Sequence, residues 1–507
     1  MPRRLPVCAH RGALYARSQR NLGTPVALST KPLRIRVPAA LTIQPLRNWL
    51  WASTNQVVFE RANVKCTLHC ISLVQWRKSS GRPLLLGSGY NRSLVGKHMN
   101  SASTPKDFED ALGKLNADYF FREFTFSSNT FGPEPTKELE LANKVVWLDD
   151  LVIVYQVKER AVQTVTSAEK ERKWFESVVM DQGTRQIRDT LTYLNTYPQI
   201  NLQNNRGDSF DVSIKTLKPH KLVIYYSHPS LPEDCLLQKY HYSKTAGVIH
   251  VLHWSAYFEI LNTLVTPIEI AEYFAYREAL ASRFRKAIEK VSEKALLGHY
   301  LRNLPEEAPG PEFEALVDKL VEQDKDWDMS HMIHVFRERR TTTGSLPQTE
   351  YTVLKSLAKL YRTDMAEFKK RFRFSMDKAL GNETCLPHRF SSSTNCGFVF
   401  IPLRREDLPY RLNLLLNYTA LNKYDQKLDK CIGLTFIAED GGKSCDVQWC
   451  PMEFTWEENP KLQAALDAKN PFRPVKEPAI SLLKMLDIEY QNLHLNADDC
   501  LVVRRLI

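Results

Sequence analysis

Two apolar runs on either side of a double aspartate form the stretch that most restricts how this chain can fold. Residues 145–148 and 151–157 are rich in β-branched and aromatic side chains, and the aspartates at 149–150 separate them. β-Branched runs that flank a short polar segment predict a β-hairpin. A two-residue turn also sets the register of the strands, with Leu148 opposite Leu151.

Polar side chains stand at the end of the second strand, where a buried strand does not normally carry them. Side chains alternate between the faces of a strand, so Gln156 and Lys158 share one face, and the register places Asn143 opposite Gln156. A charged amine is costly to bury unless an anionic group meets it. Asn143, Gln156 and Lys158 therefore form a candidate site, with Glu140 shortly upstream.

This candidate site resembles the core of the PD-(D/E)xK nuclease superfamily, and the resemblance covers residues 105–230. In that superfamily one strand supplies an Asp, and the next supplies an acidic residue, one spacer residue and a Lys. Gln156-Val157-Lys158 is similar to the QxK variant of Mrr-like restriction nucleases. Glu-Leu-Ala-Asn at 140–143 resembles the E-x-x-D that precedes the hairpin in some of those families.

The resemblance implies an α/β fold, with a restriction-endonuclease-like mixed sheet flanked by helices, and an endonuclease that hydrolyses phosphodiester bonds of DNA with Mg²⁺ or Mn²⁺. It implies that Lys158 holds the attacking water or stabilises the charge of the phosphorane, and that Glu140, Asn143 and Gln156 bind the metal. Both amides stand where the superfamily has carboxylates, the ligands that Mg²⁺ prefers. Glu140 is then the main charged ligand, unless an aspartate at 149–150 reaches round from the turn.

A long helical pattern over residues 167–194 follows the hairpin, with Gly183 as a candidate interruption. The resemblance implies that this helix packs on the nuclease sheet, where a Gln or Lys from the helix often completes the site. Gln186, with Arg185 beside it, is therefore a candidate contact to nucleic acid. The alternative is that both residues belong to a solvated helix face.

Three functional hypotheses are open from the sequence. The first is a metal-dependent DNA endonuclease. The second is a catalytically degenerate nuclease fold that binds nucleic acid or a partner protein, which the two amides favour. The third is a structural hairpin in which Gln156 and Lys158 cap the end of a strand.

The positive charge of the chain is concentrated at its N-terminal end. Residues 1–98 contain 16 Lys and Arg and one acid, Glu60, whereas the other 409 residues contain 53 basic and 57 acidic residues. Non-specific DNA affinity comes from phosphate neutralisation, so the near-neutral remainder argues against very tight binding of this kind. Three interpretations of this basic end are open: a segment that does not belong to a functional protein starting at Met99, an organelle transit peptide, or a basic nucleic-acid-binding arm. Low order is expected in each case.

Composition shifts and linker signals divide the chain into four expected parts. These are a basic, disordered extension at 1–98, the nuclease-like domain at 99–254, a helical connector at 255–311, and a second, α+β domain of unknown role at 312–507. Further strands are expected at 119–126, 209–216, 221–226, 247–253, 397–402, 431–438 and 444–449. Helices are expected from Thr104, at 255–264, from the cap Thr266 with Glu269 three residues on, and at 312–323, 347–363, 365–380, 406–425 and 459–469.

Several other classes of protein are disfavoured by the sequence. No run of about 18 apolar residues occurs, so no membrane span is expected. The ten cysteines lack paired zinc-ligand spacing, which indicates a reduced, cytoplasmic setting without a structural metal. His331 and His334 have no third ligand within sequence reach and are assigned to core or surface. DNA is the expected partner, and the oligomeric state is left open.

Overall fold

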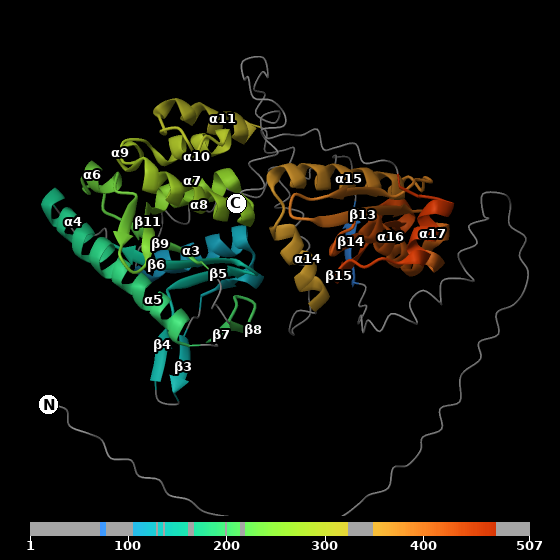
Figure 1. Ribbon diagram of the computed structural model, residues 1–507, viewed down its shortest axis with the longest axis horizontal. Helices are drawn as coiled ribbons and strands as arrows, with labels where there is room; N and C mark the ends of the chain where they lie inside the picture. The colour runs from blue at the N-terminus through green and yellow to red at the C-terminus, as the bar shows by residue number, and fades with distance from the viewer. Residues whose placement is uncertain are drawn as a thin grey trace, which may run out of the picture. The chain divides into compact units, whose positions relative to one another are not determined.

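A computed structural model of the chain describes residues 71–77, 105–127, 130–134, 137–160, 167–197, 200–212, 218–322 and 348–472 (Figure 1). The chain divides into two compact units, Met1–Lys65 and Cys66–Ile507, and all described residues belong to the second. Most of the basic segment at 1–98, together with His331 and His334, lies outside the described residues.

A six-stranded mixed sheet carries the candidate site. Its strand order is β10-β11-β9-β6-β5-β2, in which β6, β9 and β11 are parallel neighbours and the other pairs are antiparallel. The bounds are β2 Thr125–Phe126, β5 Lys144–Leu148, β6 Leu151–Glu159, β9 His220–Tyr226, β10 Tyr240–Ser243 and β11 Gly247–His253. Parallel neighbours need a crossover connection, and helices lie in both of them: α4 (Ala168–Trp174), η2 (Phe175–Gly183) and α5 (Thr184–Thr196) between β6 and β9, and α6 (Glu233–Leu236) between β9 and β11.

Helices cover both faces of this sheet because the central strands are apolar on both sides. On one face, Ile153 and Tyr155 pack with residues of α3 (Pro105–Phe120), α7 (Trp254–Leu264) and α8 (Pro267–Arg283). On the other face, Val152 and Val154 pack with a continuous helical stretch, made of α4 (Ala168–Trp174), the π-helical segment η2 (Phe175–Gly183) and α5 (Thr184–Thr196). This stretch runs across the sheet in Figure 1.

Short elements surround the six-stranded sheet. Two hairpins are formed by β3 (Thr130–Glu134) with β4 (Lys137–Glu140) and by β7 (Ile200–Gln203) with β8 (Ser209–Val212). The remaining elements of this region are η1 Arg122–Phe124, α6 Glu233–Leu236, α9 Arg285–Ile288, α10 Glu293–Arg302, η3 Pro311–Phe313 and α11 Glu314–Glu322.

A second, five-stranded sheet follows, with the order β1-β15-β14-β13-β12. Its strands are β1 Ile71–Arg77, β12 His388–Ser391, β13 Cys396–Leu403, β14 Lys430–Glu439 and β15 Ser444–Glu453. The accompanying helices are α14 Gln348–Ala358, α15 Arg362–Leu380, η4 Arg405–Tyr410, α16 Arg411–Asp425, η5 Asp440–Gly442 and α17 Pro460–Ala468. Strand β1 lies inside the N-terminal segment for which low order was expected, and it pairs with β15.

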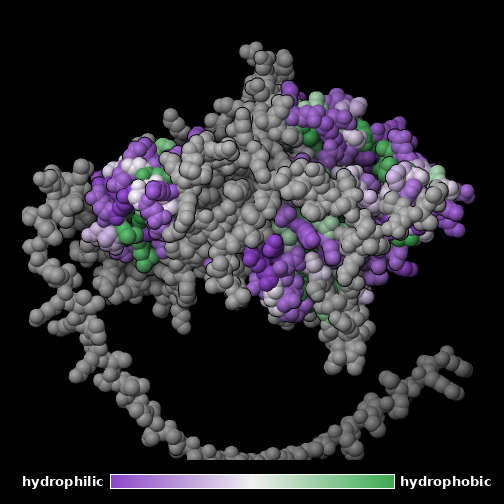
Figure 2. Space-filling view, turned by 180° about the vertical axis from the view of Figure 1, so that it is seen from behind, coloured by the Kyte–Doolittle hydropathy of each residue, from purple (hydrophilic) through white to green (hydrophobic). Residues whose placement is uncertain are grey.

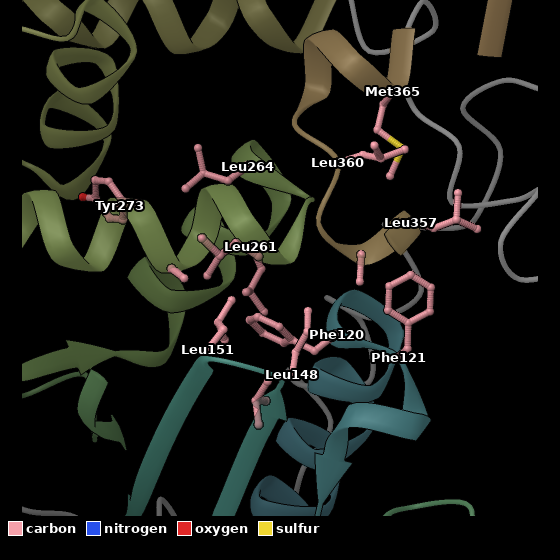
Figure 3. Close-up of a cluster of buried hydrophobic side chains, with 14 of the residues drawn as sticks. Phe120, Phe121, Leu148, Leu151, Leu261, Leu264, Tyr273, Leu357, Leu360 and Met365 are labelled. Carbon is pink, nitrogen blue, oxygen red and sulfur yellow. The ribbon is translucent and has the colours of Figure 1, made fainter. Parts of the chain in front are cut away.

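One hydrophobic cluster extends from the first sheet to helices α14 and α15. Figure 3 shows Leu357, Leu360 and Met365 on the side of Phe120 and Phe121, and these side chains belong to the same buried cluster. A buried ion pair lies in the same region: Arg362 Nη2 and Glu269 Oε2 are 2.6 Å apart, and the two side chains are 1% and 7% exposed. Residues of the connector and of helices α14 and α15 therefore belong to the same buried cluster as residues of the first sheet.

The expected mixed α/β architecture, with sheets flanked by helices, is confirmed. The expected strand at 119–126 is wrong, because helix α3 continues to Phe120 and only Thr125–Phe126 is extended. Phe108, Leu112, Leu115 and Phe120 recur near helical spacing and are almost fully buried, so their burial favours a helix over the β preference of the aromatic residues.

Polar side chains cover much of the described surface that Figure 2 shows, between smaller apolar areas. Within the described residues, no helix is long and apolar enough to cross a membrane.

Candidate functional site

The hairpin of β5 and β6 has the predicted register. Leu148 is opposite Leu151, and Val146 is opposite Ile153. Asp149 begins the turn with φ of 60°, a left-handed conformation that Asp tolerates better than most residues. The sequence therefore predicts this hairpin correctly, although it lacks the glycine that such turns usually contain.

Three polar residues of the hairpin and one from helix α5 converge near the end of β6. Lys158 Nζ donates a hydrogen bond to Gln186 Oε1. Asn143 Oδ1 accepts a hydrogen bond from the backbone N–H of Val157 at 3.0 Å. Gln156 and Lys158 are 5% and 8% exposed, so both are largely covered. We refer to Asn143, Gln156, Lys158 and Gln186 as the Lys158 site.

Helix α5 is fixed to the segment that leads into β5. Thr190 Oγ1 donates a hydrogen bond of 2.5 Å to the carbonyl of Leu141. This contact places Gln186, one helical turn before Thr190, close to the end of β6. The structure brings Gln186 and Lys158 together through their hydrogen bond, and the expected contact of Gln186 with nucleic acid stays a prediction.

Gly183 does not interrupt the helix, contrary to the sequence-based interpretation, because α5 begins at Thr184 directly after η2. The missing side chain of Gly183 lets the helix pack closely on the sheet. A Cβ at this position would lie 2.9 Å from Cγ1 of Val223 and 3.6 Å from Cε of Lys158. A larger residue would push the helix away from the sheet at the point where it covers Lys158.

Two further predicted site residues have a limited structural description. Glu140 ends strand β4, where its backbone is opposite Thr130, and its side chain lies outside the described residues. Arg185 is exposed on α5, next to Gln186. The expected roles of Glu140 and Arg185 stay predictions.

The aspartates of the turn lie at the opposite end of the hairpin from Lys158. Lys359 Nζ is 3.0 Å from Asp149 Oδ2 and 2.6 Å from Asp150 Oδ1. Lys158 lies seven residues beyond Leu151 in the same strand, roughly 23 Å at about 3.3 Å per residue. The idea that a turn aspartate reaches round to the site is therefore wrong.

The described side chains of the Lys158 site do not fit a magnesium ion. The oxygen atoms that could bind a metal belong to the neutral amides of Asn143, Gln156 and Gln186. The amide oxygen of Gln186 already accepts a hydrogen bond from the Lys158 ammonium. Mg²⁺ binds mainly through carboxylates, phosphates and water. Among the residues that the structure describes, no group of three His, Cys, Asp or Glu could hold a metal ion.

A row of side chains across the parallel strands extends the site, and sequence reasoning missed it. Lys158 is opposite Tyr225 of β9, which is opposite His253 of β11. The Tyr225 hydroxyl is buried without a hydrogen-bond partner among the described residues, and burial lowers the pKa of His253 to about 4. Tyr225 and His253 stand at the ends of two apolar runs in the sequence. Their polar groups could have indicated that they belong to the site, but only if the order of the strands had been known.

Comparisons with known proteins leave the family of this chain open. No protein-family model, no curated protein and no solved structure matches the chain.

Proposed function

We propose that residues 105–253 form a PD-(D/E)xK-like domain and that its Lys158 site binds the phosphodiester backbone of DNA. The observation that carries this proposal is the chemical composition of the site. Lys158 lies with the amides of Asn143, Gln156 and Gln186, and none of these four side chains is an acid. The domain is then the catalytically degenerate, DNA-binding form of a nuclease fold.

The two amide replacements change the kind of ion that the site attracts. Carboxylates beside a phosphate repel it unless a cation lies between them. The amide N–H groups of Asn143 and Gln156 are instead hydrogen-bond donors, which phosphate oxygens accept. Together with the Lys158 ammonium, they suit direct binding of an anion without a metal.

A second candidate function is hydrolysis of DNA with Mg²⁺ or Mn²⁺. The position of Lys158 beside the helix residue Gln186 favours it, because the resemblance implies a lysine and a helix-borne residue at such a site. Glu140 would supply the charged ligand for the cation. The described donors fit a cation poorly, so binding without cleavage is preferred.

DNA binding by the full-length protein in EDTA tests the proposal, with a labelled duplex and fluorescence anisotropy as the readout. Lys158→Met should weaken binding by about tenfold or more, the usual effect of losing a charge-assisted hydrogen bond. Lys144→Met is the matched control, because Lys144 is 7% exposed, pairs with Glu109 and lies on the neighbouring strand beside helix α3.

Equal affinity of the Lys158→Met variant and the wild-type protein would overturn the proposed binding site. The same samples, supplied with Mg²⁺ or Mn²⁺, test the second candidate on a gel. Metal-dependent cleavage that disappears in Lys158→Met would replace the binding function with the nuclease function.

A further inference from the structure

The residues of the Lys158 site are covered in this conformation. Lys158 and Gln156 are 8% and 5% exposed, and Gln186 lies over the lysine from helix α5. A DNA phosphate can reach the ammonium only after this cover moves. The question is therefore which part of the helix is built to move.

The helix that covers the site contains an unusual segment. Between α4 and α5, the nine residues of η2, Phe175–Gly183, are π-helical. π-Helical bonding is rare, usually lasts a single turn and occurs frequently at functional sites. This segment has ordinary α-helix on both sides, α4 before it and α5 after it.

Two hydroxyl groups support the π-helical segment. Ser177 Oγ donates to the carbonyl of Lys173 at 2.7 Å, and Thr184 Oγ1 donates to the carbonyl of Met180 at 2.6 Å. Hydroxyl bonds of this kind, to the carbonyl four residues earlier, compete with the backbone bonds of a helix and bend it. They supply hydrogen bonds to carbonyls near the start and the end of η2.

The segment also makes the closest contact with the sheet. Phe175 packs edge-to-face on Tyr225 with ring centroids 5.3 Å apart, and a Cβ on Gly183 would lie 2.9 Å from Val223 Cγ1. Gln186 follows only three residues after Gly183. A change in the winding of η2 is therefore transmitted directly to the residue that holds Lys158.

We propose that η2 is the gate of the Lys158 site, which opens when its π-helical bonds convert to α-helical bonds. An α-helix turns by about 100° per residue, so a shift of one residue in bonding rotates α5 by roughly that angle. The rotation moves Gln186 away from Lys158 and uncovers the ammonium. This inference rests on the proposed function for its purpose, but the opening itself does not depend on DNA.

Acylation of lysines in the full-length protein, without DNA, tests the gate. The protein is treated with an amine-acylating reagent, and the rate at each lysine is followed by mass spectrometry of the digested protein. In the wild-type protein, Lys158 should react more slowly than Lys173, which is exposed on the same helical stretch. Equal rates at the two lysines would overturn the proposal.

Two variants should move the rate at Lys158 in opposite directions. Gly183→Ala places a methyl group against Val223 and should raise the rate on the order of tenfold, the scale expected for an overpacked contact. Deletion of Gln182 removes one residue from η2, which allows α-helical bonding without rotating α5, and should lower the rate several-fold. Lys144 is the internal control, and its rate should stay constant.

The two variants also cover the outcome in which one of them fails to fold. If the Gly183→Ala variant unfolds, Lys144 also becomes reactive. The acylation rate of Lys158 in the Gln182 deletion variant then tests the gate. An unchanged Lys158 rate in a folded Gly183→Ala variant, or in the folded deletion variant, would contradict the gate. If the acylation rates agree with these predictions but the wild-type protein does not bind DNA, only the proposed function is contradicted.

Discussion

Lys359 holds Asp150 at the turn of the β5–β6 hairpin, with 2.6 Å between Nζ and Oδ1, although 209 residues separate them in the chain. The same ammonium lies 3.0 Å from Asp149. Burial alone would raise the pKa of Asp149, but Lys359, Lys355 and Lys430 together hold it below its usual value. The double aspartate thus connects the hairpin, at its end remote from Lys158, to the turn that directly follows helix α14.

Removal of the Lys359 ammonium should have a small, salt-sensitive effect on stability. Lys359 is 20% exposed and Asp150 is 79% exposed, so Lys359→Ala should cost about 1 kcal/mol or less in the free energy of unfolding. Urea unfolding at low and high salt measures this effect, which should shrink as salt rises. An effect above about 3 kcal/mol would show that the contact is buried more deeply than the structure indicates.

The buried pair of Glu269 and Arg362 should matter far more. Glu269 accepts hydrogen bonds from the Arg362 backbone N–H at 2.9 Å and from Nε and Nη2 at 2.8 and 2.6 Å. Glu269→Gln leaves the buried guanidinium without its charge partner, so the free energy of unfolding should fall by about 3–5 kcal/mol. Arg283→Ala, which removes an exposed pair with Glu306, is the control and should change little.

Stability should fall with acidification because buried histidines resist protonation. Burial, with a smaller contribution from Lys221, lowers the pKa of His220 to about 4, and burial and Arg277 lower the pKa of His250. As the pH falls, these histidines take up protons in the unfolded chain before they do so in the folded protein. Their contribution to the free energy of unfolding is therefore complete above about pH 6.5 and is lost between about pH 6.5 and about pH 4.

Urea midpoints measured from pH 7 to pH 4 test this dependence. His220→Asn should flatten the pH profile, whereas His228→Gln, a substitution in the loop after β9, should keep its slope. A profile of the His220→Asn variant as steep as that of the wild-type protein would show that other groups cause the acid sensitivity.

Restoring a carboxylate at position 143 separates the two candidate functions. Asn143→Asp keeps an oxygen that accepts the Val157 N–H but adds a negative charge beside Lys158. DNA binding in EDTA should weaken several-fold, and Mg²⁺ should restore it, because the cation then bridges carboxylate and phosphate. Binding that is unaffected in EDTA would show that no phosphate lies near residue 143.

Local sequence patterns predict the parts of the fold that depend on neighbours in the chain. Alternation and a two-residue turn are enough to predict the register of Leu148 with Leu151, and a Thr-Pro start predicts helix α8, whose cap Thr266 accepts from the Glu269 N–H. The carboxylate of Glu269, however, contacts Arg362, 93 residues away. No local pattern contains that partner, so the sequence does not reveal the joint role of these residues.

The candidate site shows the same division between local and distant information. Gln156 and Lys158 share a face because strands alternate, and the resemblance to a nuclease helix indicated Gln186. Tyr225 joins the row only through the parallel pairing of β6 with β9, which requires the strand order. The π-helical segment also escapes the sequence, because its apolar spacing differs little from that of an ordinary helix.

The salt dependence of DNA binding by Lys158→Met tests most directly the claim that Lys158 contacts a phosphate. Affinities of the wild-type protein, Lys158→Met and Lys144→Met are measured in EDTA over a series of salt concentrations. Removing one phosphate contact should lower affinity and reduce the slope of log affinity against log salt by about one, whereas Lys144→Met should keep the wild-type slope. Wild-type affinity and slope in a folded Lys158→Met variant would contradict the account.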